Sequence, residues 1–378
     1  MNRIYYFDHA ATTAVDEEVL KEMVPYFSYS YGNPSSAYTI GRQNKMAIHI
    51  ARQKVAKAIN AKPKEIYFTG CGSESDNLAL KGITYANSKN KKHIITTKIE
   101  HHAVLNTCKT LEQEGIEVTY LNVDKEGKIN LQELENSIKE NTILISIMTA
   151  NNEIGTIEPI KEIGKIARKH KILFHTDAVQ AIGNIKIDVE EMNIDLLSMS
   201  AHKFYGPKGV GALYVREGIG FKEIQDGGHQ ENGKRAGTEN VAGIVGMGKA
   251  IELVHENIEE YNKKLIELRE YCIEKLQGKI GKIKINGERK DRLPGNINIS
   301  FLGEDSSELL LKLDEKGICT SAGSACNTGA STPSHVLMSI GLNNEEAEGA
   351  LRITLGKENT KQDIDYLVNS IADIITFK

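Results

Sequence analysis

A lysine and an aspartate each follow a strand-like segment of this 378-residue sequence. Lys203 comes shortly after the apolar segment LLSMS (196–200), and Asp177 ends the segment FHTD. In a parallel sheet both residues would lie at the carboxyl edge, where α/β proteins bind their ligands. A lysine amine can form an imine with a cofactor aldehyde, and a carboxylate can keep a pyridine nitrogen protonated, so the pair indicates pyridoxal 5'-phosphate. Taken singly, the lysine would more often be an exposed loop residue and the aspartate a helix N-cap.

A third strand-like segment leads into a possible phosphate site. The stretch FTGCGSESDNLALKG (68–82) predicts a strand, a turn with two glycines and then a helix. Ser73 would open this helix with Asp76 three residues later, which is the spacing of a capping box. The free amides of such a helix start, together with the Ser73 hydroxyl, could bind a phosphate group. The stretch is neither a Walker A loop nor a full dinucleotide fingerprint, and a plain helix cap is the alternative.

One histidine and one cysteine complete the candidates. His101 follows the segment HIITT (93–97) and could stack on a cofactor ring or transfer protons, although a surface histidine is the alternative. Cys326 lies among Ser, Ala, Gly and Asn in the loop 320–333, where no apolar pattern would bury it. An exposed thiol on such a loop suits a nucleophile that moves between a bound substrate and the surface. We expect Cys108 and Cys272, by contrast, to pack inside helices.

Seven short β-branched or aromatic segments alternate with helical segments between residues 40 and 215. This alternation predicts an α/β fold with a mostly parallel seven-stranded sheet and helices on both faces. The predicted strands are 66–69, 93–97, 118–121, 142–149, 172–175, 196–200 and 212–215. A doubly wound sheet of this kind brings the strand-end candidates to a single edge.

The rest of the chain predicts a smaller α+β C-terminal domain. A charged segment from Val241 to about Gln277 has apolar residues at helical spacing, and it predicts one helix that leaves the large domain. Next are expected a solvated loop (278–296) around a short edge strand, a strand (297–301), a helix (307–316) and terminal helices. We predict an N-terminal arm (1–15) packing on the small domain, a large domain (16–257) and a small domain (258–378) that carries the cysteine loop.

The composition excludes several classes of protein. A hydrophobic fraction of 40% and a charged fraction of 26% indicate a folded globular chain. A net charge of −4 provides no field that would attract nucleic acid or an anionic membrane. No apolar run approaches the roughly 20 residues of a membrane span, and the N-terminus lacks the apolar region of a signal peptide, so we expect a cytoplasmic protein. Five cysteines without a C-x-x-C pair predict neither a disulfide framework nor a zinc cluster.

The sequence resembles the cysteine desulfurases of the NifS/IscS type, within the class V branch of pyridoxal-phosphate enzymes of fold type I. The resemblance covers essentially the whole chain. The motifs that carry it are DHAATT (8–13), GNPSS (32–36), SESDN (73–77), EHHAVL (100–105), NNEIG (151–155), DAVQ (177–180), SAHKFYGPKGVGALY (200–214), RAGTEN (235–240), GSAC (323–326) and RITLG (352–356). The large domain is accordingly expected to be a fold-type I cofactor-binding domain.

The resemblance implies a role for each candidate residue. Lys203 would form the imine with the cofactor, Asp177 would pair with the pyridinium, Gln180 would donate to the ring hydroxyl and His101 would be the stacking base. The implied phosphate cradle comprises Gly72, Ser73, Ser200 and His202, with Thr238 reaching in from the other subunit of a homodimer. The implied site of the substrate carboxylate comprises Asn152 and Arg352, and the planar guanidinium suits that carboxylate.

The implied reaction converts L-cysteine to L-alanine and transfers sulfur to Cys326 as a persulfide, for delivery to an iron–sulfur scaffold or another acceptor protein. Cys326 could also be a transient ligand of an iron–sulfur cluster, and no intrinsic metal is expected. The alternatives are a selenocysteine or cystine lyase on the same scaffold, an aminotransferase, and a binding protein that has lost its chemistry. His9 and the run Gly70-Cys71-Gly72-Ser73 depart from the family pattern, and we expect Cys71 to be a closely packed turn residue.

Overall fold

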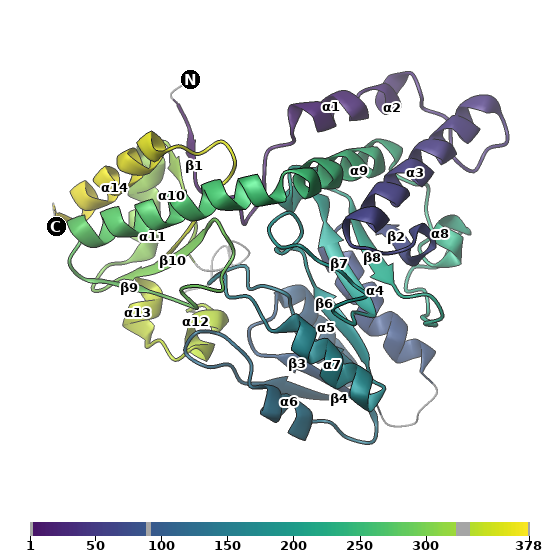
Figure 1. Ribbon diagram of the computed structural model, residues 1–378, viewed down its shortest axis with the longest axis horizontal. Helices are drawn as coiled ribbons and strands as arrows, with labels where there is room; N and C mark the ends of the chain where they lie inside the picture. The colour runs from purple at the N-terminus through teal and green to yellow at the C-terminus, as the bar shows by residue number, and fades with distance from the viewer. Residues whose placement is uncertain (1–2, 88–91, 323–332, 377–378) are drawn as a thin grey trace.

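The computed structural model describes residues 3–87, 92–322 and 333–376 (Figure 1). Cys326 therefore lies outside the described residues. The predicted α/β class is confirmed by a seven-stranded sheet in the order β2-β8-β7-β6-β5-β3-β4. Its strands are β2 (Ile66–Thr69), β3 (His93–Thr97), β4 (Glu117–Leu121), β5 (Thr142–Ser146), β6 (Leu173–Asp177), β7 (Leu196–Ser200) and β8 (Gly211–Val215). Strands β4, β3, β5, β6 and β7 pair in parallel, whereas β8 runs antiparallel to both of its neighbours.

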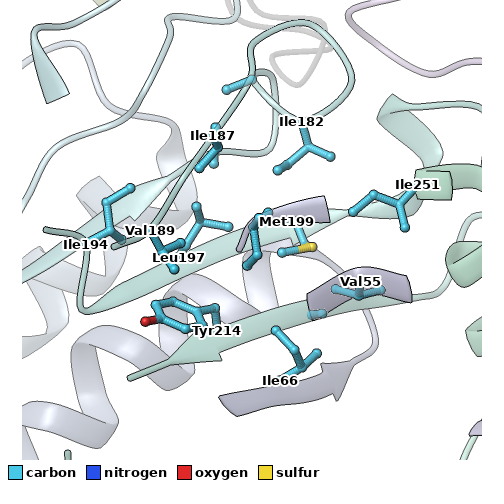
Figure 2. Packing of buried hydrophobic residues seen from close by; sticks show 14 of the residues in the cluster. Val55, Ile66, Ile182, Ile187, Val189, Ile194, Leu197, Met199, Tyr214 and Ile251 are labelled. Carbon is cyan, nitrogen blue, oxygen red and sulfur yellow. The ribbon is translucent and has the colours of Figure 1, made fainter. Parts of the chain in front are cut away.

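Two hydrophobic clusters cover opposite faces of this sheet. Tyr214 of β8 belongs to one cluster and its chain neighbours Leu213 and Val215 to the other, as expected when successive strand residues point to opposite faces. The first cluster, part of which is drawn in Figure 2, contains residues of α1 (Glu17–Met23), α3 (Thr39–Ala58), α7 (Ile160–His170) and α9 (Val241–Glu256). The second contains residues of α4 (Gly72–Ala86) and α5 (His102–Gln113). Helices therefore lie on both faces, as predicted.

Two sequence predictions about element boundaries are wrong. The predicted strand 142–149 ends at Ser146, because the chain beyond it leaves the sheet while its side chains stay buried, with Met148 packing beside Val336 and Leu337. The single helix predicted from Val241 is two helices, α9 and α10 (Ile258–Lys279), which meet at Asn257 (φ −110°, ψ 9°). In both cases the apolar pattern continues across the boundary, so periodicity could not locate it.

A second core lies around a three-stranded antiparallel sheet of β9 (Ile283–Ile285), β10 (Asn296–Phe301) and β12 (Ala350–Thr354). It contains residues of α10, α11 (Ser306–Glu315) and α14 (Lys361–Thr376). Near the N-terminus, β1 (Tyr5–Tyr6) pairs in parallel with β11 (Ile318–Cys319), and Phe7 belongs to the same core. The chain around residue 8 consequently lies close to β12, where the bridge between Asp8 and Thr354 joins the two.

The remaining helices are short: α2 (Pro25–Ser28), α6 (Leu131–Asn136), α8 (Gln230–Gly233), α12 (His335–Ser339) and α13 (Asn344–Glu348). Among the described residues, no helix combines the length and the apolar character that a membrane span requires.

Candidate active site

A cavity of about 410 Å³ lies at the carboxyl edge of the large sheet. It is lined by ten of the twelve residues that the sequence singled out: Gly72, Ser73, His101, Asn152, Asp177, Gln180, Ser200, His202, Lys203 and Arg352. Thr238 is exposed on the chain before α9 and does not line the cavity, and Cys326 lies outside the described residues. Parallel strand ends and β12 therefore meet around one space of a size typical for small-molecule sites.

Lys203 lies in the turn η2 (Ala201–Lys203) directly after β7. Its ammonium group donates hydrogen bonds to the carbonyl oxygens of Ala10 at 2.6 Å and Ala11 at 2.8 Å. The Gln180 amide donates to the Ala10 carbonyl as well, at 2.9 Å. The N-terminal segment DHAATT, to which sequence reasoning gave no part in the site, thus contacts the lysine and forms part of the cavity wall.

Arg352 points its guanidinium toward the same segment and is only 2% exposed. Its Nη2 lies 2.9 Å from a carboxylate oxygen of Asp8, and its Nη1 donates to the carbonyl of Asn152 at 3.1 Å. Its Nε is buried and has no hydrogen-bond partner. Asp8 was not predicted as a site residue, although its place in DHAATT was a signal that could have suggested it. The arrangement leaves one donor edge of Arg352 for a carboxylate ligand.

Asp177 is the last residue of β6, and its carboxylate accepts a hydrogen bond from the backbone of Val179 at 2.9 Å. Burial raises the pKa of Asp177 to about 6, while the charge of Lys203 acts in the opposite direction. Asp76 is buried beside it, and burial followed by the charge of Asp177 raises the pKa of Asp76 well above its ordinary value. A cationic ring nitrogen placed here would favour the ionised form of Asp177.

The start of α4 differs from the predicted capping box. The helix begins at Gly72 with Cys71 at the N-cap and no side-chain cap, and Asp76 is buried rather than turned toward the helix start. The predicted reciprocal cap is therefore wrong, because burial at the sheet edge overrides the local spacing signal. Glu74 instead accepts a hydrogen bond from the backbone of Gly70 at 2.7 Å. Cys71 is exposed rather than closely packed, which corrects the second expectation for this turn.

The donors at this helix start fit a phosphate group. A Cβ atom on Gly72 would lie 2.6 Å from Cγ2 of Val179 and 3.4 Å from Cβ of Ser200, so only glycine allows this close approach. The Ser200 hydroxyl is buried without a hydrogen-bond partner. The first amides of a helix are also unpaired donors and favour an anion. The residues present thus match the donors that a cofactor phosphate needs.

His101 is the N-cap of α5, and its Nδ1 accepts a hydrogen bond from the backbone of Ala103 at 3.1 Å. Burial, and then the charge of Lys203, lowers the pKa of His101 to about 4, so the ring is neutral at pH 7. Three further polar side chains that sequence reasoning missed also line the cavity, namely His102, Glu153 and His335. His102 and Glu153 belong to the motifs EHHAVL and NNEIG, and this was a signal that could have suggested them. His335 lies outside the quoted motifs and reaches the cavity through tertiary packing.

Three of the cavity residues could also hold a metal ion. Asp76, His101 and Asp177 each offer one ligand atom, and these atoms lie within 4.8 Å of one another. Two carboxylates and an imidazole would suit a divalent cation. The same atoms surround the place where Asp177 would meet a cofactor ring.

Comparison with known proteins supplies the family context. A family profile described as Aminotransferase class-V matches residues 5–367. A Clostridium botulinum protein named cysteine desulfurase IscS is 56% identical over 377 residues, which cover 99% of this chain and 95% of that protein. A solved structure titled NifS-like protein has a TM-score of 0.94 and 41% identity, and covers 100% of both chains. Another, titled SspA in complex with cysteine, has a TM-score of 0.81 and 40% identity over 94% of this chain and 99% of that one.

Proposed function

We propose how the cavity works in a chain that belongs to the class V aminotransferase family and, within it, to the cysteine desulfurases. The enzyme converts L-cysteine to L-alanine, and the observation that carries the site assignment is that ten predicted residues line one cavity. A structural relative titled as a complex with cysteine supports L-cysteine as the substrate. A selenocysteine or cystine lyase remains an outcome that the experiment below distinguishes.

The family implies pyridoxal 5'-phosphate, and we place it in this cavity. Bound there, the cofactor would supply an electron sink for the negative charge that develops on the substrate. The amides at the start of α4, with Ser73, Ser200 and His202, would hold its phosphate. Asp177 would keep a positive charge on the ring nitrogen, and His101 would stack on the ring. We prefer this assignment to a metal at Asp76, His101 and Asp177, because the Lys203 amine and the α4 helix start face the same cavity.

The remaining cavity residues bind and orient the substrate. Arg352, through its free Nε edge, and Asn152 would hold the carboxylate of L-cysteine. A fixed carboxylate directs the Cα proton toward Lys203, whose amine would remove it. Asp8 and the Asn152 carbonyl keep the guanidinium in place before the substrate arrives.

We propose Cys326 as the sulfur carrier. The chain on both sides of residues 323–332 is anchored at the cavity wall, which supports this role. On one side, Ser321 and Arg352 exchange two backbone hydrogen bonds. On the other side, the Ser334 hydroxyl bonds to the Glu153 carboxyl. The chain on both sides of the segment that carries the cysteine is therefore held close to the substrate site. A thiol that attacks the substrate sulfur has to reach that site.

We also propose a homodimer in which Thr238 completes the phosphate site of the partner subunit. Large apolar side chains stand exposed on and around α1, α2 and α3, and we name this set the α1–α3 apolar patch: Leu20, Val24, Phe27, Tyr29, Tyr31, Tyr38, Met46 and Ile50. A patch of this kind is typical of a protein–protein interface. An iron–sulfur scaffold or another sulfur acceptor stays a prediction from the family resemblance. A cytoplasmic location stays a prediction from the sequence, which shows neither a membrane-length apolar run nor the apolar region of a signal peptide.

The decisive experiment follows both products of L-cysteine. Purified protein loaded with pyridoxal 5'-phosphate should release alanine and sulfide in equal amounts when a thiol reductant is present. Without reductant, mass spectrometry should find a sulfur adduct on the peptide that contains Cys326. Turnover of selenocysteine or cystine without turnover of L-cysteine would contradict the function.

The carrier assignment needs a matched control. Cys326→Ala should bind L-cysteine and release no sulfide, whereas Cys319→Ala should retain turnover, because Cys319 lies on β11 outside the cavity. An active Cys326→Ala enzyme with an adduct on another cysteine would overturn the assignment.

A further inference from the structure

Two histidines of the cavity wall carry their protons on defined ring nitrogens. A backbone N–H can only donate, so the bond from Ala103 to Nδ1 of His101 leaves that nitrogen without a proton. Neutral His101 must therefore be protonated at Nε2. In this state its ring can donate a hydrogen bond from Nε2, and it has no free lone pair with which to accept a proton.

His335 has the opposite arrangement. Its Nε2 lies 3.0 Å from the carbonyl oxygen of Glu100, and a carbonyl can only accept, so Nε2 carries the proton. Nδ1 of the neutral ring is consequently the nitrogen with the lone pair. Burial lowers the pKa of His335, which keeps this basic form populated at pH 7.

Neighbouring contacts hold the His335 ring in place. The His102 ring packs edge-on against it with centroids 4.8 Å apart. Ser334, which precedes His335 in the chain, donates a hydrogen bond from its hydroxyl to the Glu153 carboxyl. The residue that supplies the carbonyl, Glu100, is held in turn, because its carboxyl accepts a hydrogen bond from the backbone of Met148 at 3.0 Å. His335 is therefore a fixed acceptor in the cavity wall, a few residues beyond the segment in which we place the sulfur carrier.

We propose that His335 is a further catalytic residue, the base that accepts the proton of the attacking thiol at Nδ1, and that His101, whose only lone pair is engaged by Ala103, does not take this role. This inference rests on the proposed function. The thiol S–H bond breaks and its proton moves to Nδ1, while the electron pair left on sulfur forms the S–S bond. The substrate Cβ–S bond breaks as the S–S bond forms, and its electron pair stays on Cβ, which takes up the proton that His335 received. The attacking sulfur and the substrate sulfur are together oxidised as Cβ is reduced, so no further reactant is needed.

His335→Gln tests the role of the base. The glutamine amide can still donate to the Glu100 carbonyl, but it cannot take up a proton. Single-turnover formation of alanine from L-cysteine at pH 7 should fall about 100-fold, which is in the range for loss of a general base. The deficit should shrink to less than about tenfold at pH 9, because a thiol with the ordinary pKa near 8.5 ionises without help. His170→Gln, at the end of α7, is the matched control and should follow the wild type at every pH.

The pH profile separates a base from a packing residue. The titratable groups that face His335 are His101, His102 and Lys109 on the α5 side and Glu100 and Glu153 on the strand-end side, and none of them is changed in the variant. A deficit that stays constant from pH 7 to pH 9, or no deficit at all, would overturn the proposal.

A second variant guards against a folding defect. His335→Ala should regain alanine formation when imidazole is added. A folded His335→Ala enzyme whose rate of alanine formation does not change with imidazole would also contradict the role of His335 as the base. A wild-type enzyme that forms no alanine would overturn the proposed function and this inference together. An active wild type with unaffected His335 variants would overturn the inference alone.

Discussion

At the residue scale, the ion pair between Asp8 and Arg352 explains how a buried guanidinium is stabilised when no ligand is bound. A buried charge without a partner is costly, and Asp8 at 2.9 Å supplies that partner from the N-terminal segment. The pair also fixes the plane of the guanidinium, so the rotational freedom of a long side chain is lost on folding rather than on binding. In the proposed function, the substrate carboxylate would then meet a donor edge that is already oriented.

Arg352→Lys should lower kcat/KM for L-cysteine by about 10- to 100-fold, because lysine keeps the charge and loses the fork that binds a carboxylate in two parallel bonds. Asp8→Asn should raise KM more than it lowers kcat, since the guanidinium keeps its charge and loses its orienting partner. Steady-state kinetics checks both variants. An unchanged kcat/KM in Arg352→Lys would remove Arg352 from the substrate site, and a lower KM in Asp8→Asn would mean that Asp8 competes with the substrate.

Lys203→Ala should abolish turnover, because it removes the amine that we propose reacts with the cofactor and takes the Cα proton. The cofactor should still bind through its phosphate contacts, which the substitution leaves intact. Borohydride reduction of the wild type followed by mass spectrometry should find the pyridoxyl group on the peptide that contains Lys203. Attachment to Lys208, the next lysine along the chain, would contradict the assignment.

At the element scale, the proposed phosphate site depends on how closely the start of α4 approaches Val179, just after β6, and Ser200 at the end of β7. A Cβ atom on Gly72 would lie 2.6 Å from Val179, so Gly72→Ala should push the helix start away by overpacking, at a cost of about 1–3 kcal/mol. We expect the affinity for pyridoxal 5'-phosphate to fall about tenfold or more, measured by equilibrium titration of the apoprotein. Gly115→Ala, where no atom lies within 4 Å of the added Cβ, controls for glycine replacement, although its positive φ adds local strain. Equal cofactor affinity in the two variants would show that the close approach is not needed.

At the scale of the whole molecule, the α1–α3 apolar patch predicts that the active enzyme is a dimer. Helices α1, α2 and α3 lie on the side of the large sheet away from α11 and α14 of the second core (Figure 1). Introducing charge with the double variant Phe27→Asp/Tyr29→Asp should produce monomers in light scattering, because both side chains are mostly exposed in the single chain and would be buried in an interface. Activity should fall with the dimer, since Thr238 would no longer reach the partner's phosphate site.

A matched control for the dimer lies on α11. Leu311 on α11 is 70% exposed but stands outside the patch, so Leu311→Asp should leave the mass and the activity unchanged. A monomeric wild type with full activity would contradict both the dimer and the role of Thr238.

Much of the site could be predicted from the sequence, because its residues follow strands. Lys203 and Asp177 each come after an apolar run, and in a parallel sheet the ends of such runs meet at one edge whatever the loops between them do. The same argument predicted that His101 and the Gly72–Ser73 turn lie at this edge of the sheet. This prediction of the site did not depend on the strand order or on exact element boundaries. The early end of β5 and the break between α9 and α10 therefore left it unaffected.

The partners of those residues were decided by the tertiary structure alone. Asp8 and Arg352 are separated by almost the whole chain, and they meet because β1 pairs with β11 and carries the N-terminal segment to β12. Asp76 had the spacing of a helix cap, yet it is buried beside Asp177. Local sequence encodes strand ends and helix starts through short-range periodicity and capping. The proton position on His335, by contrast, depends on a carbonyl that a distant strand end presents, and only the packed chain brings the two together.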